Sequence, residues 1–289
     1  MKFRDRAGNQ WEEVSSQDKL LEKLYESQKG RMILKILTMP IVSKIGGRCL
    51  DTYLSKVAIV PFIRKNKIPM EQYEEVSYRS YNDFFTRRIK EEYRPICHDK
   101  TSLIAPCDGK VSAYPITKQG GFVVKHTYYT VRSLLRSEAL AEKYLGGTAL
   151  VFRLTVDDYH RYCYPAEGEK TRNYYLKGKF HTVNPIANDY YPIYKENARE
   201  YTLLKTKEFG VILQMEVGAL MVGKISNYEG KATIKKGQEK GRFEFGGSTI
   251  ILLLQKDKVN VDSDLLKNTE EGFETIVRLG EVIGKSYLA

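Results

Sequence analysis

Long apolar runs, histidine and patterned cysteine are all scarce in this sequence of 289 residues. A transmembrane helix needs about 20 mostly apolar residues in a row. The longest apolar runs, 57–63 and 250–254, are far shorter, and Pro61 interrupts the first of them. The 9 prolines and 22 glycines form no repeat, which excludes collagen-like and low-complexity chains. A transmembrane helix and a collagen-like or low-complexity chain are therefore both excluded.

The first residues also lack the apolar segment that a secretory signal requires, because 1–13 is mostly polar. We therefore expect a cytosolic protein with four reduced cysteines: Cys49, Cys97, Cys107 and Cys163. Their spacings match no paired Cys-x-x-Cys zinc pattern, so we expect no metal. What is present, 42% hydrophobic and 29% charged residues, is typical of a globular protein.

Positive charge is in excess, and it is concentrated in one segment. The formal net charge is +11, and 29–67 holds many Lys and Arg residues but one acid, Asp51. Large aliphatic residues alternate with these cations, which is typical of helices on an anionic membrane surface. A core helix with a solvated basic face explains the pattern equally well. Nucleic-acid binding ranks lower because the segment has only Tyr53 and Phe62 for base stacking.

The pattern of the chain changes near residue 95. Pro and Gly divide the earlier part into short predicted helices, including 15–28 and 78–89. Later segments rich in β-branched and aromatic residues predict strands, with one helix near 130–143. The predicted strands are 111–114, 122–125, 149–155, 174–176, 200–205, 211–217, 221–225, 232–234, 242–245 and 249–255. We predict an α+β protein, with N-terminal helices followed by a mostly antiparallel, sandwich-like β domain.

Three short segments carry residues suited to chemistry. Asp108 precedes a glycine at the start of a predicted strand, an arrangement that is usually a simple turn. His160 lies in a polar turn after a strand, and the pKa of histidine suits proton transfer near neutrality. Ser248 follows two glycines and opens an apolar strand, which suits a strained nucleophile but also an ordinary hairpin. Together these residues indicate a Ser nucleophile and no more; an intact serine hydrolase and a non-enzymatic basic binding protein remain alternatives.

Six segments also follow one another in a characteristic order between residues 76 and 255. They are 82–88 (Asn-Asp-Phe-Phe-Thr-Arg-Arg), 106–109 (Pro-Cys-Asp-Gly), 158–161 (Asp-Tyr-His-Arg), 183–185 (Val-Asn-Pro), 216–223 (Glu-Val-Gly-Ala, then Val-Gly) and 236–249 (Lys-Gly through Gly-Ser-Thr). This order resembles the motifs of the pyruvoyl-dependent phosphatidylserine decarboxylase proenzyme family.

The resemblance implies a proenzyme that cuts itself between Gly247 and Ser248, giving a β chain, 1–247, and an α chain, 248–289. Ser248 would become a covalent pyruvoyl cofactor, with neither pyridoxal phosphate nor a metal. This group would act as the electron sink in converting phosphatidylserine to phosphatidylethanolamine and CO₂. Asp108 and His160 are the catalytic helpers that the resemblance implies.

A lipid substrate makes a membrane-docking role of 29–67 more plausible. We therefore expect a basic, membrane-associating helical region in 1–95 and a β-rich catalytic domain in 96–289. The expected location is peripheral, on the cytoplasmic side of the cell membrane, with an anionic membrane surface as partner and no nucleic acid. A homodimer is also implied by the resemblance.

Two positions depart from the family pattern. Many members have a second His three positions after the first, where this chain has Cys163. The self-cleavage base is therefore His160 or, as a stand-in, His181. Gly246 occupies a position where many relatives have Leu, and we expect it to loosen the site without changing its chemistry.

Overall fold

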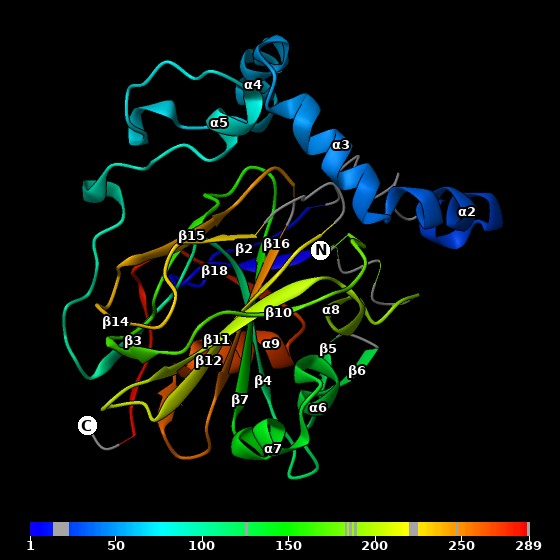
Figure 1. The fold of residues 1–289 in the computed structure, drawn as a ribbon. Coiled ribbons are helices and arrows are strands. Elements are labelled where there is room, and N and C mark those ends of the chain that lie inside the picture. Colours follow the sequence, from blue (N-terminus) through cyan, green and yellow to red (C-terminus); the bar gives the residue numbers. More distant parts are fainter. Residues whose placement is uncertain are drawn as a thin grey trace.

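The structure, a computed structural model, describes residues 1–13, 23–124, 127–182, 184, 187, 190–219, 225–246 and 248–287. In this part of the chain a large, mostly antiparallel sheet lies below an extended set of helices (Figure 1). This arrangement confirms the predicted α+β class. The strand predicted at 221–225 and residues 15–22 of the first predicted helix lie almost wholly outside the described residues.

The large sheet supplies the centre of the molecule. Among the described residues it has eleven strands, and only its β1–β18 pair is parallel. In spatial order the strands are β14 (Ala232–Ile234), β9 (Gly168–Lys170), β11 (Arg199–Lys205), β12 (Val211–Val217), β16 (Ser248–Leu254), β7 (Thr148–Leu154), β4 (Gly109–Pro115), β18 (Glu274–Val277), β1 (Lys2–Arg4) and β2 (Gln10–Glu12), with β10 (Tyr174–Leu176) paired to β11. The central strand β16 is buried along its whole length, as its apolar run predicts.

Smaller elements cover both faces of the large sheet, so that each face has its own hydrophobic core. One face carries two three-stranded sheets and a helix: β13 (Ile225–Asn227), β15 (Glu239–Phe243) and β8 (Arg161–Cys163); β17 (Val259–Val261), β19 (Val282–Ser286) and β3 (Ser102–Ile104); and α9 (Ser263–Glu270). The other face carries the hairpin β5 (Gly121–Val124) and β6 (Thr127–Thr130), with α6 (Val131–Leu135), α7 (Glu138–Ala141), η4 (Glu142–Tyr144) and α8 (Ile193–Glu196).

The basic segment folds as an arm that extends away from the sheet (Figure 1). The arm consists of α2 (Gln28–Leu37), α3 (Pro40–Leu50), the 3₁₀ helix η1 (Tyr53–Ala58) and α4 (Ile59–Asn66). Pro40 is the first residue of α3, as its role as a divider predicts, but the Ser27 side chain caps α2 at a position that was predicted to lie inside the helix 15–28. No helix of the described chain is both long and apolar enough to cross a bilayer.

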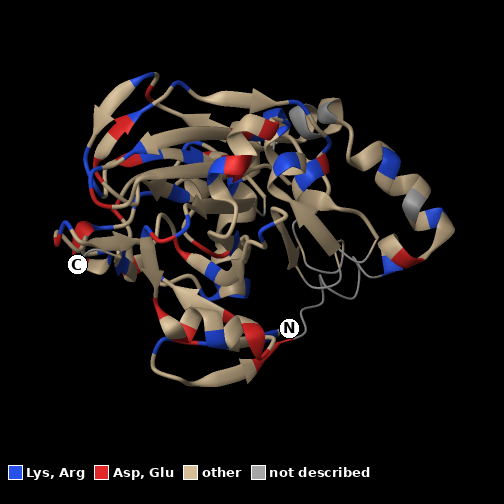
Figure 2. Cartoon of the chain, turned by 90° about the horizontal axis from the view of Figure 1, so that it is seen from below, with Lys and Arg blue, Asp and Glu red and all other residues tan. Residues whose placement is uncertain are grey.

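Most large apolar side chains of the arm face solvent. Leu54 is 79% exposed and Val57 is 81% exposed. Others that are at least half exposed or close to it are Met32, Ile33, Ile36, Met39, Ile41, Ile45 and Val60. Basic residues recur along the same arm in Figure 2. A core-helix explanation therefore does not account for these side chains, which are largely exposed.

Three short helices connect the arm to the sheet: η2 (Met70–Gln72), α5 (Tyr81–Phe85) and η3 (Glu91–Tyr93). The helix predicted at 78–89 is only the five residues of α5. The Ser80 side chain caps its start, and 88–90 instead pairs in extended form with 72–74. Tertiary hydrogen bonding has overridden the helical pattern. The helix predicted at 130–143 is likewise divided, because Arg136 adopts a left-handed conformation with φ of 51°.

The first residues belong to the sheet. Strand β1 pairs in parallel with β18 and in antiparallel with β2, so 1–13 packs with the C-terminal part of the chain. The tail, too, is structured as α9, β18 and β19, although its mixed composition gave no such signal. The division into regions at residue 95 stays a prediction, but these N-terminal strands extend the β-rich part.

Candidate active site

Ser248 is the first residue of β16, at one end of the central strands. Its side chain is fully buried, and its Oγ has no hydrogen-bond partner within the described residues. In the sheet Ser248 is opposite Leu154 of β7. The next strand, β4, starts beside Leu154 with Gly109, where a Cβ atom would be 2.8 Å from the carbonyl oxygen of Arg153. Asp108 and Ser248 therefore lie at the same end of the sheet, about two strand spacings or ~10 Å apart in the backbone.

Asp108 is held by two partners at this end. Arg94 donates to both carboxylate oxygens, with Nε–Oδ1 2.8 Å and Nη2–Oδ2 2.5 Å. The backbone N–H of Leu279 donates to Oδ1 at 2.9 Å. These bonds tie the loop before β4 to the segment after η3 and to the turn before β19. The carboxylate is thus committed to Arg94, a residue that the sequence pattern did not single out.

His160 follows the turn that ends β7 and precedes β8. Its Nδ1 lies 2.9 Å from the carbonyl oxygen of Asp158. A carbonyl only accepts, so Nδ1 carries the hydrogen and Nε2 keeps its lone pair. Nε2 is buried and has no hydrogen-bond partner in the described part of the chain. The imidazole thus offers one unoccupied proton acceptor.

The pKa of His160 is lowered to about 4, mainly because complete burial disfavours the charged ring. The Asp158 carboxylate and the carbonyls of Asp158 and Gly246 act in the opposite direction, and the Arg87 cation lowers the pKa further. His160 is therefore neutral at physiological pH and able to accept a proton.

The segment 82–88 builds the wall around His160. The ring of Phe85 is 4.1 Å from the imidazole, centroid to centroid, and also contacts Phe245 at 5.2 Å. The Asn82 side chain accepts a hydrogen bond from the backbone N–H of Phe245 at 3.1 Å. This motif therefore fixes both the histidine and the chain that precedes Ser248.

Gly246 has a φ of 123°, a conformation that residues with a side chain rarely adopt. A leucine at this position would be strained in the backbone seen here. The departure from the family pattern is therefore matched by a local conformation that suits glycine. Gly247, the other residue of the predicted cleavage site, lies outside the described residues.

Cys163 is buried and poorly suited to act as a base. Its Sγ lies 4.0 Å from the carbonyl oxygen of Ala105, and burial raises the pKa of the thiol well above its ordinary value. The thiol therefore stays protonated at neutral pH.

His181 lies in a different environment from His160. Its ring stacks on Tyr191 at 4.6 Å, and Nε2 is 3.7 Å from a carboxylate oxygen of Glu196. Burial lowers the pKa of His181, with Glu196 opposing this effect. The Asn197 side chain joins the His181 carbonyl to that of Gly218, just beyond β12. The described contacts bring His160, and not His181, to the segment before Ser248.

A buried ion pair that the sequence pattern missed lies on the Ser248 face of the sheet. The Lys240 Nζ is 2.5 Å from Oε2 of Glu216, and both side chains are fully buried. Burial lowers the pKa of Lys240 and raises that of Glu216. Glu216 is opposite Ile250, so it is a diagonal neighbour of Ser248. Only the register of β12 and β16 reveals this proximity.

Two cavities flank this end of the sheet. One, of about 780 Å³, is lined by Arg94, Arg161, Cys163 and Leu279 among others. The other, of about 630 Å³, lies between the end of α4, the N-terminal strands and the turn 155–157. No group of three or more His, Cys, Asp or Glu side chains within the described ranges is arranged to hold a metal ion.

Comparison with known proteins gives the class and then the family. The family model for phosphatidylserine decarboxylase matches residues 81–285. The chain is 45% identical over 267 residues to phosphatidylserine decarboxylase proenzyme 2 of Clostridium acetobutylicum, covering 92% of this chain and 91% of that protein. It is 39% identical over 293 residues to the phosphatidylserine decarboxylase proenzyme of Clostridium tetani, covering 99% of each.

These matches define an enzyme of the decarboxylase class. The chain belongs to the phosphatidylserine decarboxylase family, whose reaction is the decarboxylation of phosphatidylserine.

Proposed function

We propose that the chain cuts itself between Gly247 and Ser248 and then decarboxylates phosphatidylserine with the pyruvoyl group formed from Ser248. The observation that carries this proposal is a neutral histidine beside the segment that leads to a buried serine, with no hydrogen-bond partner among the described residues for either the histidine Nε2 or the serine hydroxyl. Burying a hydroxyl without a hydrogen-bond partner costs folding free energy. A catalytic role for the hydroxyl would explain why it is kept.

In the self-cleavage step, Ser248 Oγ attacks the Gly247 carbonyl carbon while His160 Nε2 takes the hydroxyl proton. The peptide C–N bond then breaks and an ester replaces it, with the proton returned to the Ser248 nitrogen. Loss of the Cα proton expels the Gly247 carboxylate, and hydrolysis of the resulting enamine releases ammonia. His160 suits the first transfer because it is uncharged at neutral pH and fixed as one tautomer.

Asp108 has a positioning role in this proposal. Its carboxylate is saturated by Arg94 and the Leu279 amide, so it fixes the loop before β4 at the Ser248 end of the sheet. Among the described residues no contact joins His181 to the segment before Ser248, so we assign the base to His160.

The pyruvoyl group fits the position because the residue that would form it opens a buried strand whose neighbours are mostly apolar. When formed, it supplies the electron sink for the charge left as CO₂ departs. His160 is again the candidate for returning a proton to the product. Neither pyridoxal phosphate nor a metal enters this proposal.

An intact serine hydrolase is the competing function, and the geometry disfavours it. In such a triad a carboxylate holds the histidine Nδ1–H. Here a backbone carbonyl, that of Asp158, takes that place, and Asp108 is bonded to Arg94 instead.

The test of self-cleavage is Ser248→Ala, measured by intact mass and by phosphatidylethanolamine formation. We expect one uncut chain with no activity, because the attacking hydroxyl is gone. Ser263→Ala, an exposed serine in the same α chain, is the matched control and should be cut and active. Phosphatidylethanolamine made by Ser248→Ala would refute the proposal.

We further propose that the arm docks peripherally on the cytoplasmic face of an anionic membrane. The support is the exposure of apolar residues along α2–α4 among many Lys and Arg residues. The predicted homodimer is open to test by light scattering of the purified protein.

A further inference from the structure

The cavity of about 630 Å³ at the end of the arm has an unusual set of charges. Four cationic side chains line it: Lys65, Lys67, Lys110 and Arg153. Two acidic side chains, Glu13 and Asp157, also line it. Cations therefore exceed acids on its wall.

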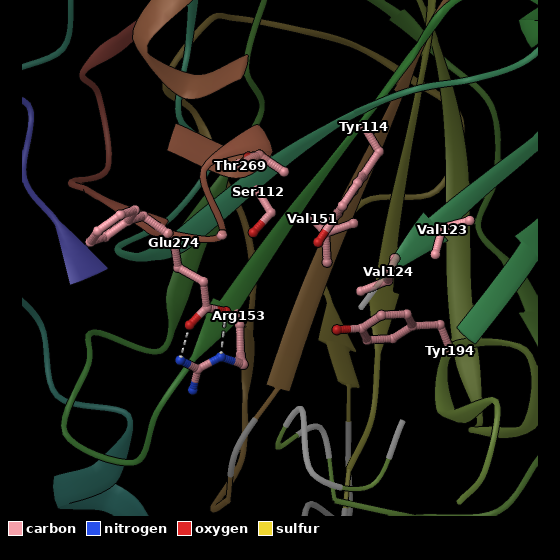
Figure 3. A pocket seen from close by; sticks show the side chains of 11 residues that line it. Ser112, Tyr114, Val123, Val124, Val151, Arg153, Tyr194, Thr269 and Glu274 are labelled. Atoms are coloured by element: carbon pink, nitrogen blue, oxygen red, sulfur yellow. Dashed lines mark hydrogen bonds and ion pairs between the residues drawn. The ribbon is translucent and has the colours of Figure 1, made fainter. Parts of the chain in front are cut away.

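Two of the four cations are already neutralised. Lys110 Nζ lies 2.8 Å and 2.7 Å from the two carboxylate oxygens of Asp158. Arg153 is clamped by Glu274 through two hydrogen bonds of 2.9 Å and 2.5 Å (Figure 3). This pair also borders a smaller cavity of about 240 Å³ on its other side.

Lys65 and Lys67 differ from these two. Both are exposed, and neither pairs with an acidic side chain within the described residues. Lys65 is in the last turn of α4, and Lys67 caps that helix in a left-handed conformation with φ of 50°. Their positive charge is therefore available to a ligand in the cavity.

The cavity adjoins the Ser248 end of the sheet. Arg153 is the cross-strand neighbour of Thr249, so its side chain lies on the face opposite that of Ser248. Thr155 and Asp157 belong to the turn that leads to His160. On its other side the cavity adjoins the arm, where Val57 and Val60 expose apolar side chains. A lipid with its chains on the arm would thus bring its head group to this cavity.

We propose that Lys65 and Lys67 bind the phosphodiester of the substrate head group in this cavity. The inference rests on the proposed function, because it takes phosphatidylserine as the lipid. Lysine binds phosphate as a point charge, and two free lysines suit a singly charged phosphodiester.

The first test is the double variant Lys65→Gln/Lys67→Gln, assayed with phosphatidylserine in neutral detergent micelles. Neutral micelles remove the general attraction to an anionic surface. We expect KM to rise about ten-fold or more with kcat nearly unchanged, because charged hydrogen bonds to the phosphate are lost. Self-cleavage, followed by intact mass, should stay complete.

Lys205→Gln/Lys207→Gln is the matched control. It removes two exposed lysines at the same spacing, at the opposite end of the sheet, where Lys205 pairs with Val211. Its KM should equal that of the unmodified protein. An equal KM in both double variants would overturn the assignment while leaving the proposed function intact.

A second test does not depend on activity. Trp11 is the single tryptophan of the chain, and it lines the cavity. Glycerophosphoserine should change Trp11 fluorescence saturably in the uncut Ser248→Ala protein, and the change should vanish when Lys65 and Lys67 are also replaced. No change in Ser248→Ala would overturn the site. An equal response to inorganic phosphate would mean a general phosphate site and would overturn the head-group assignment.

Discussion

The arm and the central strand β16 are both rich in aliphatic residues, but those of the arm are mostly exposed and those of β16 are buried. Every residue of β16 is buried, whereas Leu54 and Val57 of the arm are about four-fifths exposed. The difference lies in what separates the apolar residues. No charge interrupts 248–254, but Lys and Arg recur throughout 29–67. Apolar content alone therefore does not predict a core, and the interleaved cations indicate a surface with an external partner.

The largest expected change in stability comes from removing one charge from the buried interior of the sheet. Lys240→Met leaves the Glu216 carboxyl buried without its partner. We expect a loss of about 3–5 kcal/mol in the free energy of unfolding, measured by urea denaturation. The double variant Glu216→Leu/Lys240→Met should recover most of the loss, because the two charges are then removed together. A single variant as stable as the unmodified protein would show that the pair is not desolvated.

The same substitution at one leucine in each region tests the comparison directly. Leu252 in β16 is fully buried and Leu54 in the arm is 79% exposed. Leu252→Ala should cost about 2–5 kcal/mol of unfolding free energy because it creates a cavity. Leu54→Ala should change that free energy by less than about 0.5 kcal/mol. A similar cost at both positions would mean that the arm packs as a core in solution.

Burial of His160 makes the stability of the folded protein depend on pH. Its pKa is about 4 in the folded protein, and an unfolded histidine has a pKa of about 6.5. Between these values the unfolded chain binds a proton that the folded chain does not. Stability should therefore be unaffected above pH 6.5 and should fall by about 3 kcal/mol as the pH drops towards 4.

The measurement compares urea unfolding at several pH values in the Ser248→Ala background, where every chain is uncut. His160→Gln should flatten the pH dependence between 6.5 and 4 relative to the parent. If both variants lost stability equally over this range, His160 would not be the group responsible.

A further prediction concerns the charge of the arm and affects membrane binding instead of folding. Lys29→Gln/Lys35→Gln should weaken binding to anionic vesicles by about 1 kcal/mol for each charge, without affecting self-cleavage. Sedimentation with vesicles of graded anionic lipid content measures this change. If the double variant bound anionic vesicles as strongly as the unmodified protein, and salt weakened the binding of neither, the arm would be excluded as an electrostatic docking surface.

The sequence predicted the strands that its periodicity marks clearly. The apolar runs at 149–155, 211–217 and 249–255 correspond to β7, β12 and β16. Strands β1, β8 and β18 were missed because they are three or four residues long and depend on pairing with distant segments. The helix expected at 78–89 was wrong in length because residues near 89 pair with those near 73.

The candidate site residues were predicted from motifs, and their roles stay a prediction, but their contacts could not be predicted. The motifs placed Asp108, His160 and Ser248, and the fold gathers the start of β4, the turn before β8 and the start of β16 at one end of the sheet. No local pattern indicates that Arg94 binds Asp108 or that Lys240 binds Glu216. Such pairs join residues that are distant in sequence, and burial makes them specific. The tautomer of His160 likewise depends on a backbone carbonyl that only the folded turn presents.

The most direct test of the central claim is the intact mass of the purified, unmodified protein. The proposal predicts two chains, 1–247 and 248–289, the smaller one lighter by one ammonia than a peptide that starts with serine. That result would establish both the cut and the pyruvoyl end. A single chain of full length that still converts phosphatidylserine to phosphatidylethanolamine would contradict the proposed mechanism.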